Sequence, residues 1–531
     1  MLMRIFLPAL MILVMLVNFA EAAGAKILFV PHDDRPVSFQ QTAEVIEQAG
    51  YEILTPPKKL LGLDGANSHP DELWRWLEKN APNADAAVIA SDSMLYGGLI
   101  PSRKHEIPAE ILAARVERFK NLREKNPALK LYVFGSLMRT PYVGTKGDIE
   151  EPEYYAEYGK NIHDYTALVD KSETDGLTAA EKTQLAALKK SIPAKYLNDW
   201  LGRRAKNFAA IKKLIDFTRA GTIDYLVIGR DDNSPLSQTH KENRALFAYA
   251  HNLSKNKFQS LAGIDEFNLL LLTRAINEMR GDTPKIFVAY NTGVGGETVP
   301  FFSDEPISAS IADEAVITGS KIVDEPSRAD LVLLVNTDPL GETLWAHNRK
   351  PDGTKMIPDY TPNYGTKFFA GLVAGYLSQG CAVSVADINF SNGSDNALMK
   401  ILHDKNLLYR LKSYAGWNTA TNSTGFALAT GILALNMSGD AKDKILTRRY
   451  LDDWAYQANI RTIVGCQLSP VHYYQFDGER DWVEAEETRL MREFAQKNLP
   501  PFEYLSGLTV KNPWNRMFEC EIDFQRPSVS H

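Results

Sequence analysis

The chain has 531 residues, of which 44% are hydrophobic and 24% are charged, and this composition is typical of a globular protein. The length is enough for about two to four domains with large apolar cores. A formal net charge of -7 argues against a nucleic-acid-binding protein, because such proteins need a basic surface to neutralise phosphates. We therefore expect the partner to be a small molecule or a glycan and not a nucleic acid.

The first residues of the chain follow the pattern of a secretory signal peptide. Arg4 precedes the apolar stretch Ile5–Val17, and small residues follow from Ala20 to Ala25. A membrane-spanning helix needs about 20 apolar residues, so this short stretch favours a cleaved signal over an uncleaved anchor. We predict that residues 1–23 are removed, that the mature protein is periplasmic or secreted, and that it keeps no stable membrane span.

Segments typical of strands and helices alternate in the first part of the mature chain. In chain order, the pattern predicts a strand at 26–31, a helix at 39–48, a strand at 52–54, a helix after Pro70, and strands at 85–90 and 130–136 that flank a helix at 109–125. Alternation of this kind predicts βαβ units around a parallel sheet.

The alternation stops between residues 150 and 222, where the chain is charged and lacks strand patterns. Thr178 and Glu181 have the spacing of a capping box at the start of a helix. We predict a helical insertion over 150–222, which is either a lid over the functional site or a plain helical subdomain.

The α/β pattern resumes after the insertion. The sequence predicts strands at 225–229, 285–290, 331–336 and 382–387, and helices at 265–279 and 367–377. The chain becomes less regular after Trp417, where helices are predicted at 425–435 and 482–498.

About nine or ten strands of this kind fit two fold classes. One is a pair of tandem, Rossmann-like α/β domains with mostly parallel sheets, and the other is an elaborated (β/α)8 barrel. The sequential βαβαβ opening favours the tandem domains. We predict an N-terminal α/β domain at 24–282 with the insertion at 150–222, a second α/β domain at 283–440, and a mainly helical C-terminal region at 441–531.

Polar residues follow the ends of several predicted strands. Asp33-Asp34-Arg35 follows the first strand, Asp92 the third, Asp231-Asp232-Asn233 a later one, and Asp387 a strand near residue 385. Functional groups gather at the carboxyl ends of parallel strands in α/β folds. The sequence therefore predicts a catalytic cleft at these strand ends.

The two carboxylate pairs carry the chemistry in this prediction. Asp232 is our candidate general acid and Asp231 its ionised partner, since neighbouring carboxylates push their pKa values apart. Asp34 is the candidate second acid or ligand. Oxygen ligands of this kind also suit Mg²⁺, Mn²⁺ or Ca²⁺, and an ion pair at the sheet edge is the structural alternative for Asp33 and Arg35.

Other polar and aromatic residues suit the binding of a substrate. Tyr96 and Arg103, on either side of Pro101, can bind a sugar or a carboxylate, and the loops around Asn389 and Trp417 offer amides and a ring for a carbohydrate. Asx turns are the alternative explanation for these amides. The predicted substrate-binding residues are Asp33, Arg35, Asp92, Tyr96, Arg103, Asn233, Asp387, Asn389, Asn392, Trp417 and Asn418.

Asp265 and Glu266 precede a predicted helix. A helix N-cap and a first-turn acid explain these two residues at least as well as catalysis does.

Several of these motifs, taken in order, resemble a bacterial family classified as domain of unknown function 4127. They run from Val30-Pro31-His32-Asp33-Asp34-Arg35-Pro36 and Ser91-Asp92-Ser93-Met94-Leu95-Tyr96-Gly97-Gly98 through Arg230-Asp231-Asp232-Asn233 and Gly263-Ile264-Asp265-Glu266 to Gly416-Trp417-Asn418-Thr419. The resemblance covers nearly the whole mature chain. It implies one shared architecture with a polar site, and it brings no activity with it.

Three functions remain open at this point. The leading hypothesis is an exported, glycosidase-like hydrolase that acts on a carbohydrate or glycoconjugate through strand-end carboxylates and requires no cofactor. The second is a metal-dependent phosphoester or amide hydrolase, in which Asp33, Asp34, Asp92 and Asp232 bind a divalent cation. The third is a periplasmic small-molecule-binding protein, because tandem α/β domains around a cleft suit that function.

Overall fold

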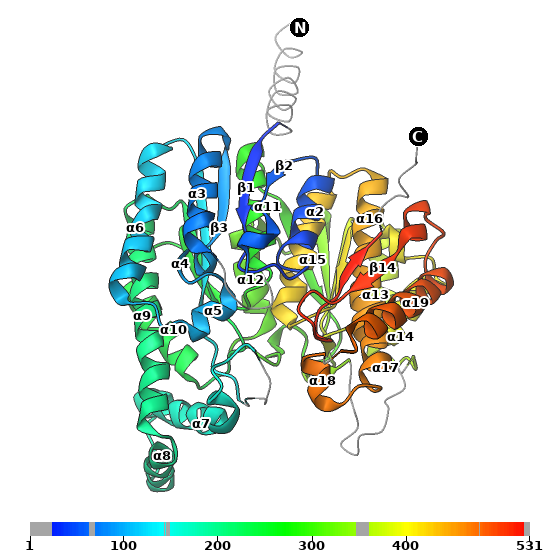
Figure 1. The fold of residues 1–531 in the computed structure, drawn as a ribbon. Helices are drawn as coiled ribbons and strands as arrows, with labels where there is room; N and C mark the ends of the chain where they lie inside the picture. The colour runs from blue at the N-terminus through cyan, green and yellow to red at the C-terminus, as the bar shows by residue number, and fades with distance from the viewer. Residues whose placement is uncertain are drawn as a thin grey trace, which may run out of the picture.

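The structure is a computed structural model that describes residues 24–62, 69–142, 144, 149–346, 360–476 and 478–524. The predicted signal peptide, residues 1–23, lies outside the described residues. Helices and strands alternate along most of the described chain (Figure 1). None of the described helices combines the length and the apolar composition needed to cross a membrane.

Two open, parallel sheets organise the molecule. The first has the order β2-β1-β3-β4-β5-β6, with β1 at Lys26–Val30, β2 at Glu52–Leu54, β3 at Ala86–Ala90, β4 at Lys130–Leu137, β5 at Tyr225–Arg230 and β6 at Phe258–Ala262. The second has the order β13-β11-β9-β7-β8, with β7 at Lys285–Tyr290, β8 at Lys321–Ile322, β9 at Leu331–Asn336, β11 at Val383–Asp387 and β13 at Ser413–Ala415. The two parallel sheets with their helices confirm the predicted α/β fold. Neither sheet closes on itself in the described chain, so the alternative prediction of a (β/α)8 barrel is wrong.

The two sheets repeat one strand order. When the strands of each sheet are numbered in chain order, both begin 2-1-3-4-5, and the first sheet adds a sixth strand. This is the doubly wound order of flavodoxin-like sheets, whose ligands bind at the carboxyl ends near the switch point between strands 1 and 3. The sequence carries no visible repeat, so the symmetry is one of topology.

The sheets and helices form five layers (Figure 1). In β1, Ile27 and Phe29 join the core between the two sheets, while Leu28 and Val30 join the core on the outer face. Burial on both faces explains why such strands are continuous apolar runs. The middle layer contains α2 (Gln40–Gln48), α11 (Phe267–Arg280), α12 (Ile307–Ile317) and α15 (Ala420–Ala434).

The outer layers cover the remaining faces. The first sheet is covered by α3 (Pro70–Asn80), α4 (Ser91–Leu95), α6 (Ala109–Lys125) and α9 (Ala194–Arg219). The second sheet is covered by α13 (Tyr364–Ser378), α14 (Asn396–Asp404), the π-helix η6 (Tyr450–Ile460) and α19 (Arg480–Asn498).

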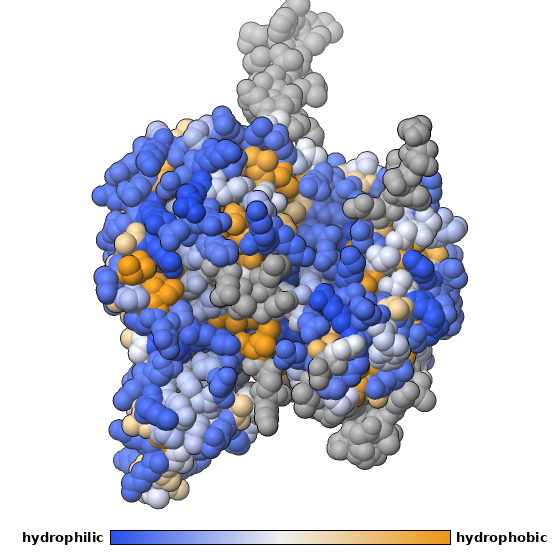
Figure 2. Space-filling model, viewed as in Figure 1, coloured by the Kyte–Doolittle hydropathy of each residue, from blue (hydrophilic) through white to orange (hydrophobic). Residues whose placement is uncertain are grey.

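The predicted insertion consists of α7 (Tyr155–Thr174), α8 (Ala179–Ser191) and α9. Thr178 and Glu181 form the predicted capping box at the start of α8. No side chain of α8 is buried, and the protruding insertion is mostly hydrophilic on the face seen in Figure 2. Asp170 of α7 anchors the insertion by accepting hydrogen bonds from His240 and Arg244 of α10 (Gln238–Tyr249).

The C-terminal region packs back against the first half of the chain. It contains α16 (Gly439–Arg449), η6, α17 (Arg461–Gly465), α18 (Pro470–Tyr474), α19 and the antiparallel pair β14 (Thr509–Lys511) and β15 (Glu521–Asp523). Arg448 of α16 forms an ion pair with Glu44 of α2, and Gln41 donates a 2.6 Å hydrogen bond to Asp452. These contacts hold the two halves of the molecule together.

The sequence analysis missed several elements, among them β6, β13, α12, α16 and η6. In β6 the polar residues Gln259 and Ser260 interrupt the apolar pattern, although both are buried. Ser260 donates a hydrogen bond to Asn243, which satisfies its hydroxyl group inside the fold. β13 has only three residues, too few for a period to appear.

Candidate functional site

A cavity of about 410 Å³ lies where the carboxyl ends of the two sheets meet. The loops after β1, β3, β4, β5 and β6 supply one side, and loops of the second sheet and the C-terminal region supply the other. Its charged and amide residues are Asp33, Arg35, Arg103, Arg139, Glu150, Asp231, Asp232, Asp265, Asn392, Asn418, Arg461 and Arg516. Aromatic side chains of Phe302, Tyr473, Tyr474, Trp514 and Phe518 complete the wall.

The Asp231-Asp232 pair follows directly after β5 and faces this cavity. Arg103 donates a 2.5 Å hydrogen bond to Asp231, and Arg139 donates a 2.8 Å hydrogen bond to Asp232. The side chains of the two aspartates are 16% and 23% exposed, so both are accessible from the cavity. Burial and the charge of Asp231 raise the pKa of Asp232 to about 7. The protonated form of Asp232 is therefore favoured more than that of an exposed aspartate.

The loops after β1 and β6 meet in a second carboxylate cluster. Arg35 binds Asp33 with a 2.8 Å hydrogen bond and Asp265 with one of 2.6 Å. Asn418 from the second sheet also donates a 2.6 Å hydrogen bond to Asp265, and His32 lies 2.9 Å from it. Burial alone would raise the pKa of Asp265, but Arg35 and His32 outweigh burial and lower it to about 2. Asp265 is thus a fixed negative charge in the cavity wall.

The helix-cap interpretation of Asp265 is wrong. Glu266 occupies the N-cap position of α11 and makes no side-chain cap hydrogen bond. The carboxylate of Asp265 instead binds Arg35 and Asn418, which come from the two different sheets.

Glu150 links three of the cavity arginines. Its carboxylate accepts hydrogen bonds of 2.8 Å from Arg103 and Arg516, and it lies 3.1 Å from Arg139. These three positive charges overcome the effect of burial and hold the pKa of Glu150 well below its usual range. Sequence analysis missed Glu150 because it stands at the start of the charged insertion, where neither strand end nor motif marks it.

Asp34 lies behind the aromatic wall and does not line the cavity. Its carboxyl group accepts a 2.8 Å hydrogen bond from the indole nitrogen of Trp514. Burial raises the pKa of Asp34 to about 7. Trp514 in turn packs against Arg35 and Arg516, whose guanidinium carbons lie 5.4 and 4.9 Å from the ring centre. In this arrangement Asp34 orients Trp514 and has no access to a ligand.

Strained backbone is concentrated at the cavity. Six described residues other than glycine have positive φ angles, and four of them line the cavity: Asp232, Phe302, Asn392 and Asn418. A bulky residue such as Phe302, with φ at 66°, adopts this conformation only when its surroundings enforce it. Backbone strain of this kind clusters at functional sites.

Seven of the predicted site residues line the cavity and seven lie behind its walls. Those in the cavity are Asp33, Arg35, Arg103, Asp231, Asp232, Asn392 and Asn418. Those behind the walls are Asp34, Asp92, Tyr96, Asn233, Asp387, Asn389 and Trp417.

The buried residues of the first half contact other residues of the fold, although the side-chain nitrogen of Asn233 has no hydrogen-bond partner among the described residues. Asp92 accepts a 2.7 Å hydrogen bond from Ser136, and burial raises its pKa to about 6. Tyr96 stacks on His105 at 4.9 Å between ring centres, and Asn233 accepts a hydrogen bond from Ser237. Gly98 packs close to the main chain of the loop after β1, where an added Cβ would lie 3.2 Å from the carbonyl oxygen of His32.

The buried residues of the second half form their own network. Asp387 accepts hydrogen bonds from Asn336 and Tyr414, at 2.8 and 2.7 Å. Asn389 donates a hydrogen bond to Asp395. Trp417 is 3% exposed and packs 5.8 Å from Phe518, between ring centres, so it supports the cavity wall from behind.

The helices of the insertion also lie away from the cavity. The described cavity lining includes Glu150 but no residue of α7, α8 or α9. The structure therefore gives no support to the lid interpretation.

The cavity carboxylates are held by arginines. Asp33 and Asp265 bind Arg35, Asp231 binds Arg103, and Asp232 binds Arg139. Among the described residues, no group of three or more His, Cys, Asp or Glu side chains is arranged to hold a metal ion. Of the four ligands in the metal hypothesis, Asp34 and Asp92 point to Trp514 and Ser136, away from Asp33 and Asp232.

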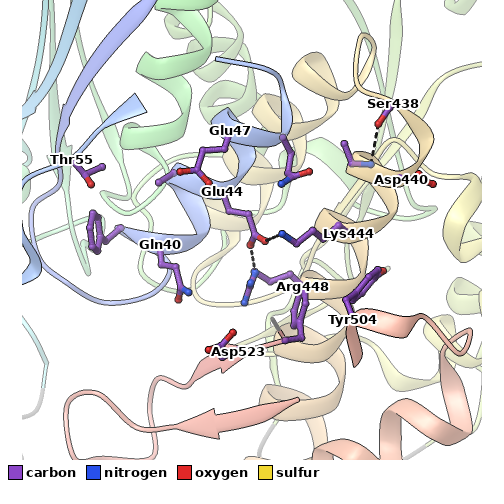
Figure 3. Close-up of a pocket in the computed structure, with 15 residues that line it drawn as sticks. Gln40, Glu44, Glu47, Thr55, Ser438, Asp440, Lys444, Arg448, Tyr504 and Asp523 are labelled. Carbon is purple, nitrogen blue, oxygen red and sulfur yellow. Dashed lines mark hydrogen bonds and ion pairs between the residues drawn. The ribbon is translucent and has the colours of Figure 1, made fainter. Parts of the chain in front are cut away.

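A second, larger cavity of about 860 Å³ lies between α2 and α16 (Figure 3). Glu44 projects into it and pairs with Lys444 and Arg448 from the facing helix. None of the predicted site residues lines this cavity. Its polar groups bind each other across the contact between the two halves of the chain.

The fold and the site define an α/β protein in which two doubly wound, parallel sheets share one polar cavity at their carboxyl ends. The chain belongs to the family described as protein of unknown function (DUF4127), whose model matches residues 27–523. A search of curated proteins finds no match to this chain.

Proposed function

We propose that this protein is an exported, glycosidase-like hydrolase that cleaves a carbohydrate or glycoconjugate in the cavity between the two sheets. The observation that carries the proposal is Asp232, a half-buried carboxyl group with a pKa of about 7 that faces the cavity beside a second carboxylate. A raised pKa next to an ionised partner is what a general acid for glycoside cleavage needs. The signal-like pattern at the N-terminus supports export.

The reaction divides between the two adjacent aspartates. Asp232 donates its proton to the glycosidic oxygen as the bond to the anomeric carbon breaks. Asp231, held in place by Arg103, is the partner that accepts a proton from the attacking water. Water supplies one hydroxyl group to the sugar, and the leaving group departs as the alcohol.

The remaining cavity residues suit the transition state and the sugar. Asp265 adds a fixed negative charge, which stabilises the positive charge that develops on the ring. The amides of Asn392 and Asn418 suit the hydroxyl groups of a sugar. On this proposal Asp34 acts only through Trp514.

The test is hydrolysis of a panel of phenyl glycosides by the mature protein and its Asp232→Asn variant. We expect at least one glycoside to be cleaved, and we expect the variant to lose about 10²- to 10⁴-fold in kcat/KM. Asp404→Asn on the surface of α14 is the matched control and should keep the full rate. Equal rates for wild type and Asp232→Asn on every cleaved substrate would refute the proposal.

A second candidate is a periplasmic small-molecule-binding protein. Two sheets of the same strand order around one cavity favour this function. Its signature is tight, stoichiometric binding of a sugar by calorimetry, with the sugar recovered unchanged after prolonged incubation.

A further inference from the structure

Five arginines line the cavity, and one of them differs from the other four. Arg35, Arg103, Arg139 and Arg516 each form an ion pair with at least one aspartate or glutamate. Arg461 forms none with the described residues, although it is only 2% exposed. A buried guanidinium without a counter-ion is costly, so its position calls for an anion.

Neutral groups hold Arg461 in place. Its Nε donates a 2.7 Å hydrogen bond to the hydroxyl group of Tyr473, and its Nη1 donates one of 3.0 Å to Gln457. The ring of Phe518 lies under the guanidinium, 4.7 Å from its central carbon. No described residue accepts a hydrogen bond from Nη2. The side chain is thus oriented by its neighbours while its charge remains unneutralised.

A second polar group lies on the same wall. Asn392 lines the cavity in a left-handed conformation, with φ at 58°, and its side-chain amide binds no described residue. The next residue, Gly393, packs so closely on η6 that an added Cβ would lie 3.0 Å from the backbone nitrogen of Ala458. Ala458 precedes Arg461 by about one helical turn, which brings Asn392 and Arg461 to one region of the wall.

We propose that Arg461, with Asn392 beside it, binds a carboxylate group of the substrate, so that the protein acts on sugar acids such as uronides. This inference rests on the proposed function and specifies its substrate class. The guanidinium forms charge-assisted hydrogen bonds to the carboxylate, and the Asn392 amide donates to the same group.

The other charges of the cavity favour a single negative charge over a double one. Asp33, Glu150, Asp231 and Asp265 line the same cavity, and each already forms an ion pair with an arginine, so Arg461 is the cavity arginine left to balance the charge of a ligand. A carboxylate carries one charge, which matches the one arginine that lacks an acidic partner.

The experiment compares substrates that differ only in this group. Phenyl glucuronide and phenyl galacturonide are assayed against phenyl glucoside and phenyl galactoside, in both anomeric forms. Binding of free glucuronate, galacturonate, their neutral parents and glucose 6-phosphate is measured by calorimetry on the same protein. We expect uronides to be preferred by about 10- to 100-fold in kcat/KM and in affinity.

Variants assign the preference to the residue. In Arg461→Met the ratio of uronide to neutral substrate should fall close to one, and Arg461→Lys should restore part of it. Arg489→Met, an exposed arginine on α19, is the matched control and should keep the wild-type ratio. Thermal unfolding of each variant reports whether the fold is intact, and a variant that fails to fold is replaced by Asn392→Ala, which should lower the ratio less.

The outcomes separate the two proposals. Binding of uronates that depends on Arg461, without hydrolysis of any glycoside, would overturn the hydrolase and support the carboxylate site. Hydrolysis of neutral glycosides with no preference for uronides would support the hydrolase and overturn the carboxylate site. Tighter binding of glucose 6-phosphate than of either uronate would also overturn it.

Discussion

The two parallel sheets have the same strand order but use the polar residues at their strand ends differently. In the first sheet, Asp33, Asp232 and Asp265 reach a cavity and are held by arginines. In the second sheet, Asp387 accepts hydrogen bonds from Asn336 and from the hydroxyl group of Tyr414. A carboxylate at a strand end is therefore a sign of function only where the fold leaves space in front of it.

The comparison predicts opposite effects for equivalent substitutions. Asp387→Ala removes an acceptor from Asn336, Tyr414 and the backbone of Asp395, and we expect a loss of about 3–5 kcal/mol in the free energy of unfolding. Asp232→Ala should change stability by less than about 1 kcal/mol, because the side chain is partly exposed and Arg139 keeps its ion pairs with Glu150 and Glu151. Urea denaturation measures both. A larger loss of unfolding free energy for Asp232→Ala than for Asp387→Ala would contradict the functional role of Asp232 and the structural role of Asp387.

Two buried acids, Glu266 and Glu314, lie in the helical layer between the sheets and face neither the cavity nor an arginine. They therefore show how a carboxyl group behaves when the fold leaves it without either. Burial raises the pKa of Glu314 to about 8, and burial and Glu314 raise that of Glu266 well above its usual range. Because the unfolded chain releases these protons at lower pH, the free energy of unfolding should fall as pH rises from about 4.5 to 8.

Glu314→Gln should remove part of this dependence and stabilise the protein at pH 8 by about 2–3 kcal/mol relative to wild type. The measurement is urea denaturation between pH 5 and 9. Glu493→Gln, on the surface of α19, is the control. Parallel stability curves for wild type and Glu314→Gln would contradict the assignment of a neutral Glu314.

The pH profile of catalysis tests the environment of Asp232 itself. A general acid with a raised pKa is active while protonated, so kcat/KM should fall about tenfold per pH unit above pH 7. Arg139 favours the ionised form of Asp232, so Arg139→Met should move the fall in kcat/KM to higher pH. If kcat/KM of Arg139→Met falls at the same pH as that of the wild type, the titrating group is not Asp232.

The smallest effect is expected at the aromatic wall. Trp514→Phe keeps a ring but removes the hydrogen bond to Asp34, and we expect a loss of about 1 kcal/mol in stability. Trp482→Phe, at an exposed position of α19, should change stability by less than about 0.5 kcal/mol. Equal effects of the two substitutions in urea denaturation would show that the bond to Asp34 contributes nothing.

Much of the fold could be predicted, because the apolar runs of strands and the apolar periodicity of helices can be recognised within a few consecutive residues. The strand predictions at 26–31, 52–54, 285–290 and 331–336 match β1, β2, β7 and β9 within one residue. β6 escaped because its polar residues are satisfied by partners far along the chain, such as Asn243. The π-helix η6 has no sequence period that distinguishes it from an α-helix.

The site could be predicted only in part, for a physical reason. The side of the cavity built from strand ends, such as Asp232 and Arg35, has a local signature of an apolar run followed by charge. Arg461 and Trp514 come from the irregular C-terminal region, and only tertiary packing brings them to the strand ends. Sequence analysis also could not tell which acids face the cavity, since adjacent residues such as Asp33 and Asp34 point to different partners.

The most direct test of the account is the leaving-group dependence of the Asp232→Asn variant. A 2,4-dinitrophenyl glycoside leaves without protonation, whereas an alkyl glycoside of the same sugar needs the acid. The account predicts that Asp232→Asn loses about 10²- to 10⁴-fold on the alkyl glycoside and less than about tenfold on the dinitrophenyl glycoside. An equal loss on both substrates would contradict the assignment of Asp232 as the general acid.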